Sequence, residues 1–286
     1  MDYVKPTEVI RNMIDTGIAK AALPARDLLI RGFLSGALLA ISTSLAITAT
    51  VQTGIPMVGA VVFPVGFVII VLLGLELVTG SFALVPLARI EGKTSTATLI
   101  SNLAWVFLGN LIGSLFYGAL LYVCWTMMGS NAPDAVAAKL VAIAEAKTLG
   151  YAKFGAAGIV TTFVKAALCN WMVTLGVVMA MTSKSTVGKI AACWLPIFIF
   201  FAQGFEHSVV NMFVIPTGML LGAKVSLSDW WLWNQIPVTL GNFVGGFIFT
   251  GLTLYLTLKP RGAAPVLAGG AASPAADELI FEKESA

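Results

Sequence analysis

Residues 203–211 read QGFEHSVVN and interrupt an apolar run that extends from residue 190 to residue 222. Residues 74–81, GLELVTGS, interrupt a second apolar run, 59–87, in the same way. At membrane depth, polar residues and glycines are tolerated only where the backbone is buried in protein or lines a cavity. Both runs are therefore predicted to be broken helices, whose unpaired backbone groups can coordinate a solute. The alternative, a glycine kink with polar packing groups, is less favoured because the interruptions occupy matched positions.

The apolar runs on either side of these segments extend over most of the chain. Of all residues 58% are hydrophobic and 11% are charged, and the mean hydropathy is +0.92, whereas a soluble domain carries about 25% charged residues. Six runs reach the length of about 20 residues that a membrane span requires. They are 28–50, 59–87, 97–128, 156–182, 190–222 and 234–258. The predicted fold is an all-α membrane protein with broken second and fifth helices.

The chain divides into three parts. Residues 1–27 hold an amphipathic pattern that predicts a short helix on the inner membrane face, or a solvated one. Residues 28–258 are predicted to form one six-span domain that carries the solute path, and the tail, 259–286, is expected to be disordered because it is rich in Ala, Gly and Pro and then acidic.

Basic residues near the spans predict the orientation. The side that receives both ends of the chain also receives Arg89, Lys93, Lys184 and Lys189. Positively charged short loops stay inside, so both termini are predicted to be cytoplasmic, in a plasma (inner) membrane. The tryptophans at 230–233 fit an aromatic belt at the outer face.

Three pairs of polar residues recur at nearly constant spacing. They are Arg31 with Lys165, Glu76 with Glu206, and Asn110 with Asn242. Together they indicate a duplicated three-helix unit. Because three is odd, the second copy is expected to insert upside down, which places a solute path at the interface of the two repeats.

The single histidine is the main candidate for chemistry. An ionisable residue at membrane depth is a functional candidate by default, which favours a working His207 over a satisfied core residue. Glu206 and Glu76 are interpreted as anchors of the broken segments. Asn170 is either a hydrogen-bond donor to the path or a helix-packing residue.

Several classes of protein are excluded. A net charge of +3 implies no nucleic-acid partner. The three cysteines form no CxxC pair, and one histidine cannot build a metal site, so neither metal nor cofactor is predicted. Nucleophile-elbow, phosphate-loop and zinc-helix motifs are missing, as are the twin Asn-Pro-Ala boxes of an aquaporin.

Three motifs together carry a resemblance to a known family. The stretch GFEHSVVNMF at 204–213, with Ile215-Pro216, is similar to the signature of the formate/nitrite transporter family. LCNWMV at 168–173 resembles its fourth-helix motif, and 74–81 resembles its broken second helix. The resemblance covers residues 5–258. It implies an aquaporin-like protomer in a homopentamer within the lipid bilayer, with one pore each for small monovalent anions such as formate, nitrite or hydrosulfide, often moved with protons.

The resemblance also assigns roles to individual residues. His207 matches the central histidine, Thr79 the loop threonine beside it, and Asn170 the fourth-helix asparagine. The family's vestibule lysine corresponds to Lys147 by local sequence or to Lys153 by distance from Asn170. The apolar constrictions of the family match Phe67, Val78 and Phe200. Two further polar residues, Glu206 and Asn211, are placed along the path.

Three functions remain to be compared. An anion channel or proton-linked anion transporter explains a midplane histidine. An aquaporin-like channel for small neutral solutes has no need of one. A membrane-embedded enzyme would require a second catalytic group facing His207, and its sequence neighbours Glu206 and Ser208 point elsewhere on a helix.

Overall fold

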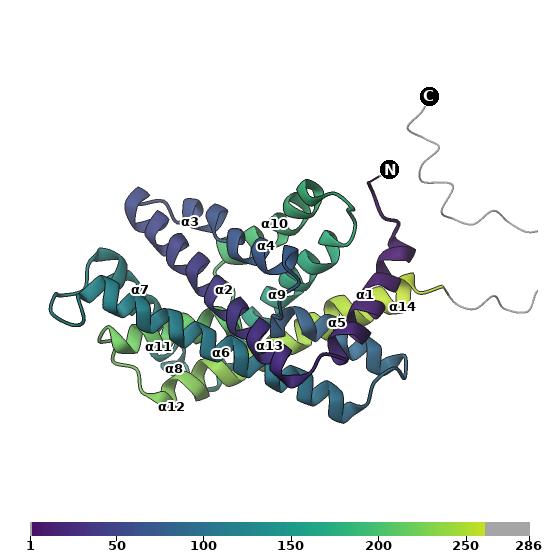
Figure 1. Cartoon of the computed structure of the whole chain (residues 1–286). Helices are drawn as coiled ribbons and strands as arrows, with labels where there is room; N and C mark the ends of the chain where they lie inside the picture. The colour runs from purple at the N-terminus through teal and green to yellow at the C-terminus, as the bar shows by residue number, and fades with distance from the viewer. Residues whose placement is uncertain (1, 261–286) are drawn as a thin grey trace, which may run out of the picture.

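The structure, a computed structural model, describes residues 2–260 as an assembly of helices (Figure 1). The predicted tail from residue 261 onward lies outside the described residues. Four helical stretches are long and apolar enough to cross a membrane. They are α2 (Ala25–Thr53), α6 (Thr96–Thr126), α9 (Ala156–Ala180) and the composite stretch Leu227–Leu258.

The other two apolar runs are interrupted where the sequence predicts. The first consists of α3 (Pro56–Val62) and α4 (Pro64–Leu72), then an extended segment, then α5 (Val78–Ile90). The second consists of α10 (Thr186–Ala202), an extended segment and α11 (Ser208–Leu220).

A glycine with positive φ opens each interruption. Gly74 has φ 62° and Gly204 has φ 64°, a conformation that residues with a Cβ rarely adopt. The chain then runs extended to Leu77 and His207, whose φ and ψ agree within a few degrees. The two glycines therefore end the first half-helices and turn the chain toward the centre.

The last stretch contains two π-helical segments. In order it comprises α12 (Leu227–Trp230), η1 (Trp231–Gln235), α13 (Ile236–Val244), η2 (Gly245–Leu252) and α14 (Thr253–Leu258). The predicted aromatic belt is corrected at Trp230, which is buried and whose indole N–H donates to Gln235. Trp231 and Trp233 are half-buried.

The N-terminal helix α1 (Pro6–Ala21) is a packed element. Ile10 and Met13 are fully buried in a cluster with Leu84 and Leu87 of α5, and Leu254 of α14 also packs there. Its amphipathic pattern therefore reflects a protein neighbour, which the sequence pattern alone did not identify.

The segment 129–155, between the third and fourth apolar runs, contains α7 (Ala135–Lys147) and α8 (Leu149–Ala152). Leu140 and Ala144 of α7 are fully buried, and Gly218 of α11 lies directly against Ala144. Helix α7 therefore packs against α11 as α1 packs against α5. Both halves of the chain include such a packed short helix (Figure 1).

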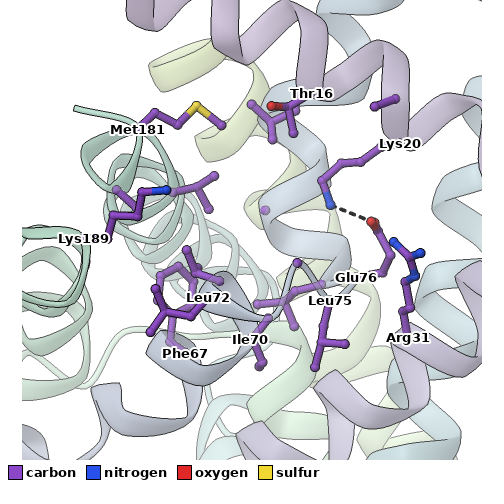
Figure 2. A pocket seen from close by; sticks show the side chains of 18 of the residues that line it. Thr16, Lys20, Arg31, Phe67, Ile70, Leu72, Leu75, Glu76, Met181 and Lys189 are labelled. Atoms are coloured by element: carbon purple, nitrogen blue, oxygen red, sulfur yellow. Dashed lines mark hydrogen bonds and ion pairs between the residues drawn. The ribbon is translucent and has the colours of Figure 1, made fainter. Parts of the chain in front are cut away.

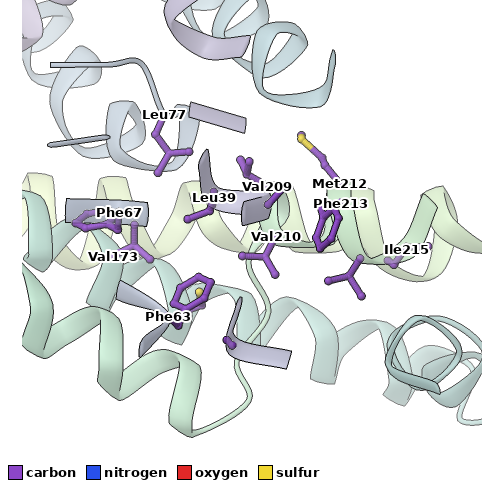
Figure 3. Packing of buried hydrophobic residues seen from close by; sticks show 14 of the residues in the cluster. Leu39, Phe63, Phe67, Leu77, Val173, Val209, Val210, Met212, Phe213 and Ile215 are labelled. Carbon is purple, nitrogen blue, oxygen red and sulfur yellow. The ribbon is translucent and has the colours of Figure 1, made fainter. Parts of the chain in front are cut away.

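Close helix pairs hold the assembly together. A Cβ on Gly113 of α6 would lie 1.9 Å from the Phe33 carbonyl oxygen of α2, and one on Gly245 would lie 2.1 Å from the Ala167 carbonyl oxygen of α9. Between these pairs an apolar core surrounds the interruptions and includes Phe63, Val173 and Val210 (Figure 3). Cys169 and Cys193 are buried in this core, whereas Cys124 is exposed.

Candidate transport site

The two interruptions meet at a hydrogen bond between His207 and Thr79. The Nε2 atom of His207 lies 3.1 Å from the Thr79 hydroxyl oxygen, and both residues are buried. His207 is the last residue of the second interruption, and Thr79 lies in the first turn of α5. The centre of the molecule is therefore built from both halves of the chain.

The backbone determines which nitrogen of His207 carries a proton. Nδ1 accepts a hydrogen bond from the Val210 N–H at 3.2 Å, which makes His207 the N-cap of α11. An accepting Nδ1 has no proton, so the neutral ring carries its proton on Nε2 and donates it to Thr79. The Thr79 hydroxyl hydrogen then remains available to a solute.

Phe200 fixes the plane of the imidazole. The two rings are stacked, with centroids 5.7 Å apart and an interplanar angle of 20°. Phe200 and Phe67 are both buried, as is Val78, so all three predicted constriction residues lie in the core close to the interruptions. An apolar surround of this kind excludes water from the central polar pair.

Asn170 holds the backbone beside the central pair. Its amide nitrogen donates to the carbonyl oxygens of Thr79, at 3.0 Å, and of Asn242, at 2.6 Å. Its carboxamide oxygen is buried and has no hydrogen-bond partner among the residues that the structure describes. Asn170 therefore positions Thr79 and retains an open acceptor.

Two asparagines clamp the interruptions. Asn110 accepts from the Val78 N–H and donates to the carbonyl oxygens of Gly32 and Glu76, at 2.8–2.9 Å. Asn242 accepts from the Ser208 N–H and donates to Ala166 and Glu206 at the same distances. Each asparagine thus satisfies backbone groups that the broken helix leaves unpaired.

The second interruption is anchored by an ion pair. Lys147, at the end of α7, donates to the Glu206 carboxylate at 2.7 Å, and Asn211 and Tyr151 donate to the same carboxylate at 2.8 Å. Burial raises the pKa of Tyr151, which keeps its hydroxyl protonated as a donor. Glu206 and Asn211 therefore hold the loop in place.

The structure distinguishes the two lysines that the sequence left open. Lys147 reaches the buried loop, whereas the side chain of Lys153 is exposed. Lys165 lies with its Nζ atom 5.7 Å from the centre of the Tyr151 ring, a cation–π distance. Lys147 is thus the lysine in contact with the second interruption.

A matching ion pair in the first half was not predicted. Lys20, in the last turn of α1, donates to Glu76 at 2.8 Å, and Ser81 contributes a longer bond of 3.5 Å (Figure 2). The sequence contained a signal: Lys20 precedes Glu76 by 56 residues and Lys147 precedes Glu206 by 59. Extending the repeat to include the short helices would have found it.

A cavity of about 390 Å³ lies beside the Lys20–Glu76 pair. Its walls come from α1, α2, α4, α5, α9 and α10, and Phe67, Leu77 and Gly80 line it toward the centre of the molecule. Figure 2 shows this chamber with the ion pair on one wall. Leu77 and Gly80 in its wall flank Val78 and Thr79 in the chain, which places the cavity beside the first interruption.

Long apolar helices, two interruptions that meet at a polar centre, and a lysine–glutamate pair at each interruption define an integral membrane protein of the transport class. A family model described as "Formate/nitrite transporter" matches residues 7–256. The chain belongs to the formate/nitrite transporter family.

Individual relatives agree with this assignment. A "Probable formate transporter" of Methanothermobacter thermautotrophicus is 40% identical, covering 83% of this chain and 91% of the relative. The "Formate channel BtFdhC" of Bacillus thuringiensis is 31% identical, covering 89% and 96%. A solved "FNT family ion channel" superposes with a TM-score of 0.76 at 27% identity, covering 87% and 98% of the two chains.

A second solved structure carries a ligand. This "Pentameric formate channel with formate bound" superposes with a TM-score of 0.66 at 25% identity, covering 81% of this chain and 96% of that one. The resemblance read from the residues is confirmed at the level of the family, and an anion channel or transporter replaces the neutral-solute and enzyme alternatives.

Proposed function

We propose that this protein conducts formate or a similar small monovalent anion, such as nitrite or hydrosulfide, across a plasma (inner) membrane, and that His207 links the flux to protons. The observation that carries the proposal is the buried His207–Thr79 hydrogen bond at the meeting point of the two interruptions. The names of the curated relatives support formate as the first substrate to test.

The proposed topology has six spans in two inverted three-helix repeats, with both termini in the cytoplasm. The identical clamps made by Asn110 and Asn242 support the repeat, and the basic residues on the side of the termini support the orientation. The protomer is proposed to assemble as a homopentamer, because the solved formate-bound channel that it resembles is pentameric.

Dehydration is the main barrier for an anion in such a pore. Removing a charge from water costs several kcal/mol unless the protein provides compensating partners. Thr79 receives the Nε2–H of His207, so its own O–H can donate to the anion. The anion thus meets a hydroxyl donor at the narrow, apolar centre.

A proton on His207 would lower the barrier further. The ring can bind a second proton only at Nδ1, which must first give up the Val210 N–H. An anion at Thr79 compensates for that loss by attracting the imidazolium. The imidazolium then transfers one proton to the carboxylate oxygen, which leaves a neutral imidazole and a neutral acid that crosses the apolar constriction.

Proteoliposome uptake tests this function. We expect formate uptake that accelerates when the anion side is acidified, that nitrite or hydrosulfide inhibits, and that glycerol leaves unchanged. Equal uptake of glycerol and formate, without dependence on pH, would instead support a neutral-solute channel. Cross-linking of the detergent-solubilised complex should give five protomers, and a largest product of three would contradict the pentamer.

A further inference from the structure

The chamber beside α1 holds more positive charge than its ion pair neutralises. Its lining includes the cations Lys20, Arg31 and Lys189, and one carboxylate, Glu76. The Nζ atom of Lys20 lies 2.8 Å from a carboxylate oxygen of Glu76, so the charges of these two residues cancel. Within residues 2–260, neither Arg31 nor Lys189 forms a salt bridge. Three cations less one carboxylate leave a surplus of two positive charges in this chamber.

The two surplus cations lie on opposite walls. Arg31 comes from α2 and lies on the side of Glu76, whereas Lys189 comes from α10 and lies across the chamber (Figure 2). Both are half-buried. The wall between them is apolar and includes Phe67, Ile70 and Leu72. Low-dielectric walls lined by one sign of charge focus the field and raise the local concentration of the opposite ion.

Carboxylates on the approach lie outside this chamber. A groove of about 460 Å³ adjoins it and shares Thr16, Met181 and Lys189 with its lining. Glu8 and Asp15 line this groove together with Lys184, so apart from the shared Lys189 it carries one net negative charge. The positive field is therefore concentrated in the inner chamber, next to the constriction.

The other half of the molecule has a smaller surplus, because only one of the two cations has a charged counterpart there. Arg31 corresponds to Lys165, whose ammonium group lies over the Tyr151 ring. At the spacing of Glu76 and Glu206, Lys189 corresponds to Gly59, which carries no charge. The two approaches to the centre, similar in their lysine–glutamate pairs, therefore differ in their remaining cations.

We propose that Arg31 and Lys189 form an anion-holding station for small monovalent carboxylates in the chamber on the side of the chain termini. This inference rests on the proposed function. The station lowers the free energy of an anion in this chamber and leaves the far approach unchanged. Half-saturation of transport therefore occurs at a lower anion concentration on the side of the termini.

A passive pore restricts how the station can be detected. Equal concentrations on both sides give no net flux, whatever charge either chamber carries, because a fixed charge supplies no driving force. The station must therefore be measured through the half-saturating concentration on each side separately. The experiment uses the full-length protein inserted in one orientation in proteoliposomes, with formate supplied from one side at a time.

The variants are Arg31→Gln, Lys189→Gln and the double substitution. At low ionic strength the double variant is expected to raise the half-saturating formate concentration on the side of the termini by about tenfold, the lower end of the effect of a focused cleft. The value on the opposite side should stay within about twofold. High salt should reduce the difference because it screens the two cations.

Lys93→Gln is the matched control, since it removes one positive charge from an exposed position in the turn after α5, on the side of the termini and outside the chamber. It should leave both half-saturating concentrations unchanged. If the wild type transports formate but the double variant behaves like Lys93→Gln, the station does not exist while the proposed function stands. Absence of formate transport by the wild type would overturn the proposed function itself.

Discussion

Asn110 and Asn242 make the same three hydrogen bonds in the two halves of the chain, each accepting from one backbone N–H and donating to two carbonyl oxygens. One carbonyl belongs to the first long helix of the same half, which is α2 for Asn110 and α9 for Asn242. The other carbonyl belongs to the glutamate of the interruption. Each side chain therefore ties a broken segment to an unbroken helix, which gives the extended backbone a fixed position.

Replacing either clamp should destabilise the protein. Asn110→Ala and Asn242→Ala each leave three buried backbone groups without this partner, at about 1–3 kcal/mol for each group that finds no substitute. We expect both to lower the thermal unfolding temperature in detergent and to reduce formate uptake. Asn131→Ala, at an exposed position, should change neither quantity. A comparable loss in that control would contradict a specific clamp.

His207→Asn should remove the coupling of formate transport to protons while leaving the pore intact. Asparagine is a favoured N-cap and can still accept the Val210 N–H, so α11 should begin as before. It cannot bind a proton, so formate uptake should lose its steep dependence on pH while the unfolding temperature changes little. Uptake measured across a series of pH values checks this. A wild-type pH profile in the variant would show that the proton comes from bulk water.

Lys147→Gln should affect both stability and transport. It leaves the buried Glu206 carboxylate without its cation, which costs about 3 kcal/mol or more, and it should lower uptake at low salt more than at high salt. Adding Glu206→Gln removes the unpaired charge and should restore most of the stability. Lys153→Gln, at an exposed position, is the control. An equal effect of both lysine variants would refute the assignment of Lys147.

The end of α14 should loosen in acid. Hydrogen bonds from Lys259 and Tyr255 lower the pKa of Glu91, the residue after α5. A carboxyl whose folded-state pKa is lowered stabilises the fold above its ordinary value, about 4.3, and this stabilisation disappears as the pH falls through the folded-state value. The protection factors of the amides at 253–258, obtained by dividing out the intrinsic exchange rate at each pH, should therefore fall in acid. Glu91→Gln should exchange faster at neutral pH and lack this dependence.

Cysteine accessibility tests the orientation. In a Cys124→Ser background, which removes the exposed native thiol, a membrane-impermeant maleimide should label Ser130→Cys from outside intact cells. Lys184→Cys should react only after the membrane is opened. Labelling in the reverse order would place the termini outside and overturn the proposed topology.

The interruptions could be predicted because their signal is local. Glycines and ionisable residues in the middle of an apolar run do not fit an unbroken span, and the coincidence of Glu76 with Glu206 at a fixed spacing strengthened the interpretation. Gly74 and Gly204 do adopt the positive φ that such a break requires. The residues of the central site follow from the same segments.

The partners of the lysines could not be predicted, because they depend on packing. Helix α7 is rich in alanine and lies in a segment between spans, so its contact with α11 is not visible in the sequence pattern. Lys20 was missed for the same reason, since the pattern of α1 identified an apolar face but not its neighbour. The proton position on His207 depends on one backbone N–H that no pattern reveals.

The contact between His207 and Thr79 has a consequence for the origin of the chain. At the spacing of the two glutamates, His207 corresponds to Leu77 and Thr79 corresponds to Val209. Two identical copies of either half would bring together two histidines facing valines, or two leucines facing threonines, and neither arrangement contains the donor–acceptor pair. The supporting asparagines and lysines are the same residue types at matching positions in the two halves. The residues of the central pair differ between the halves at matching positions. Under the proposed repeat, gene duplication alone would supply the framework, and only later, unequal substitution in the two copies would supply the chemistry.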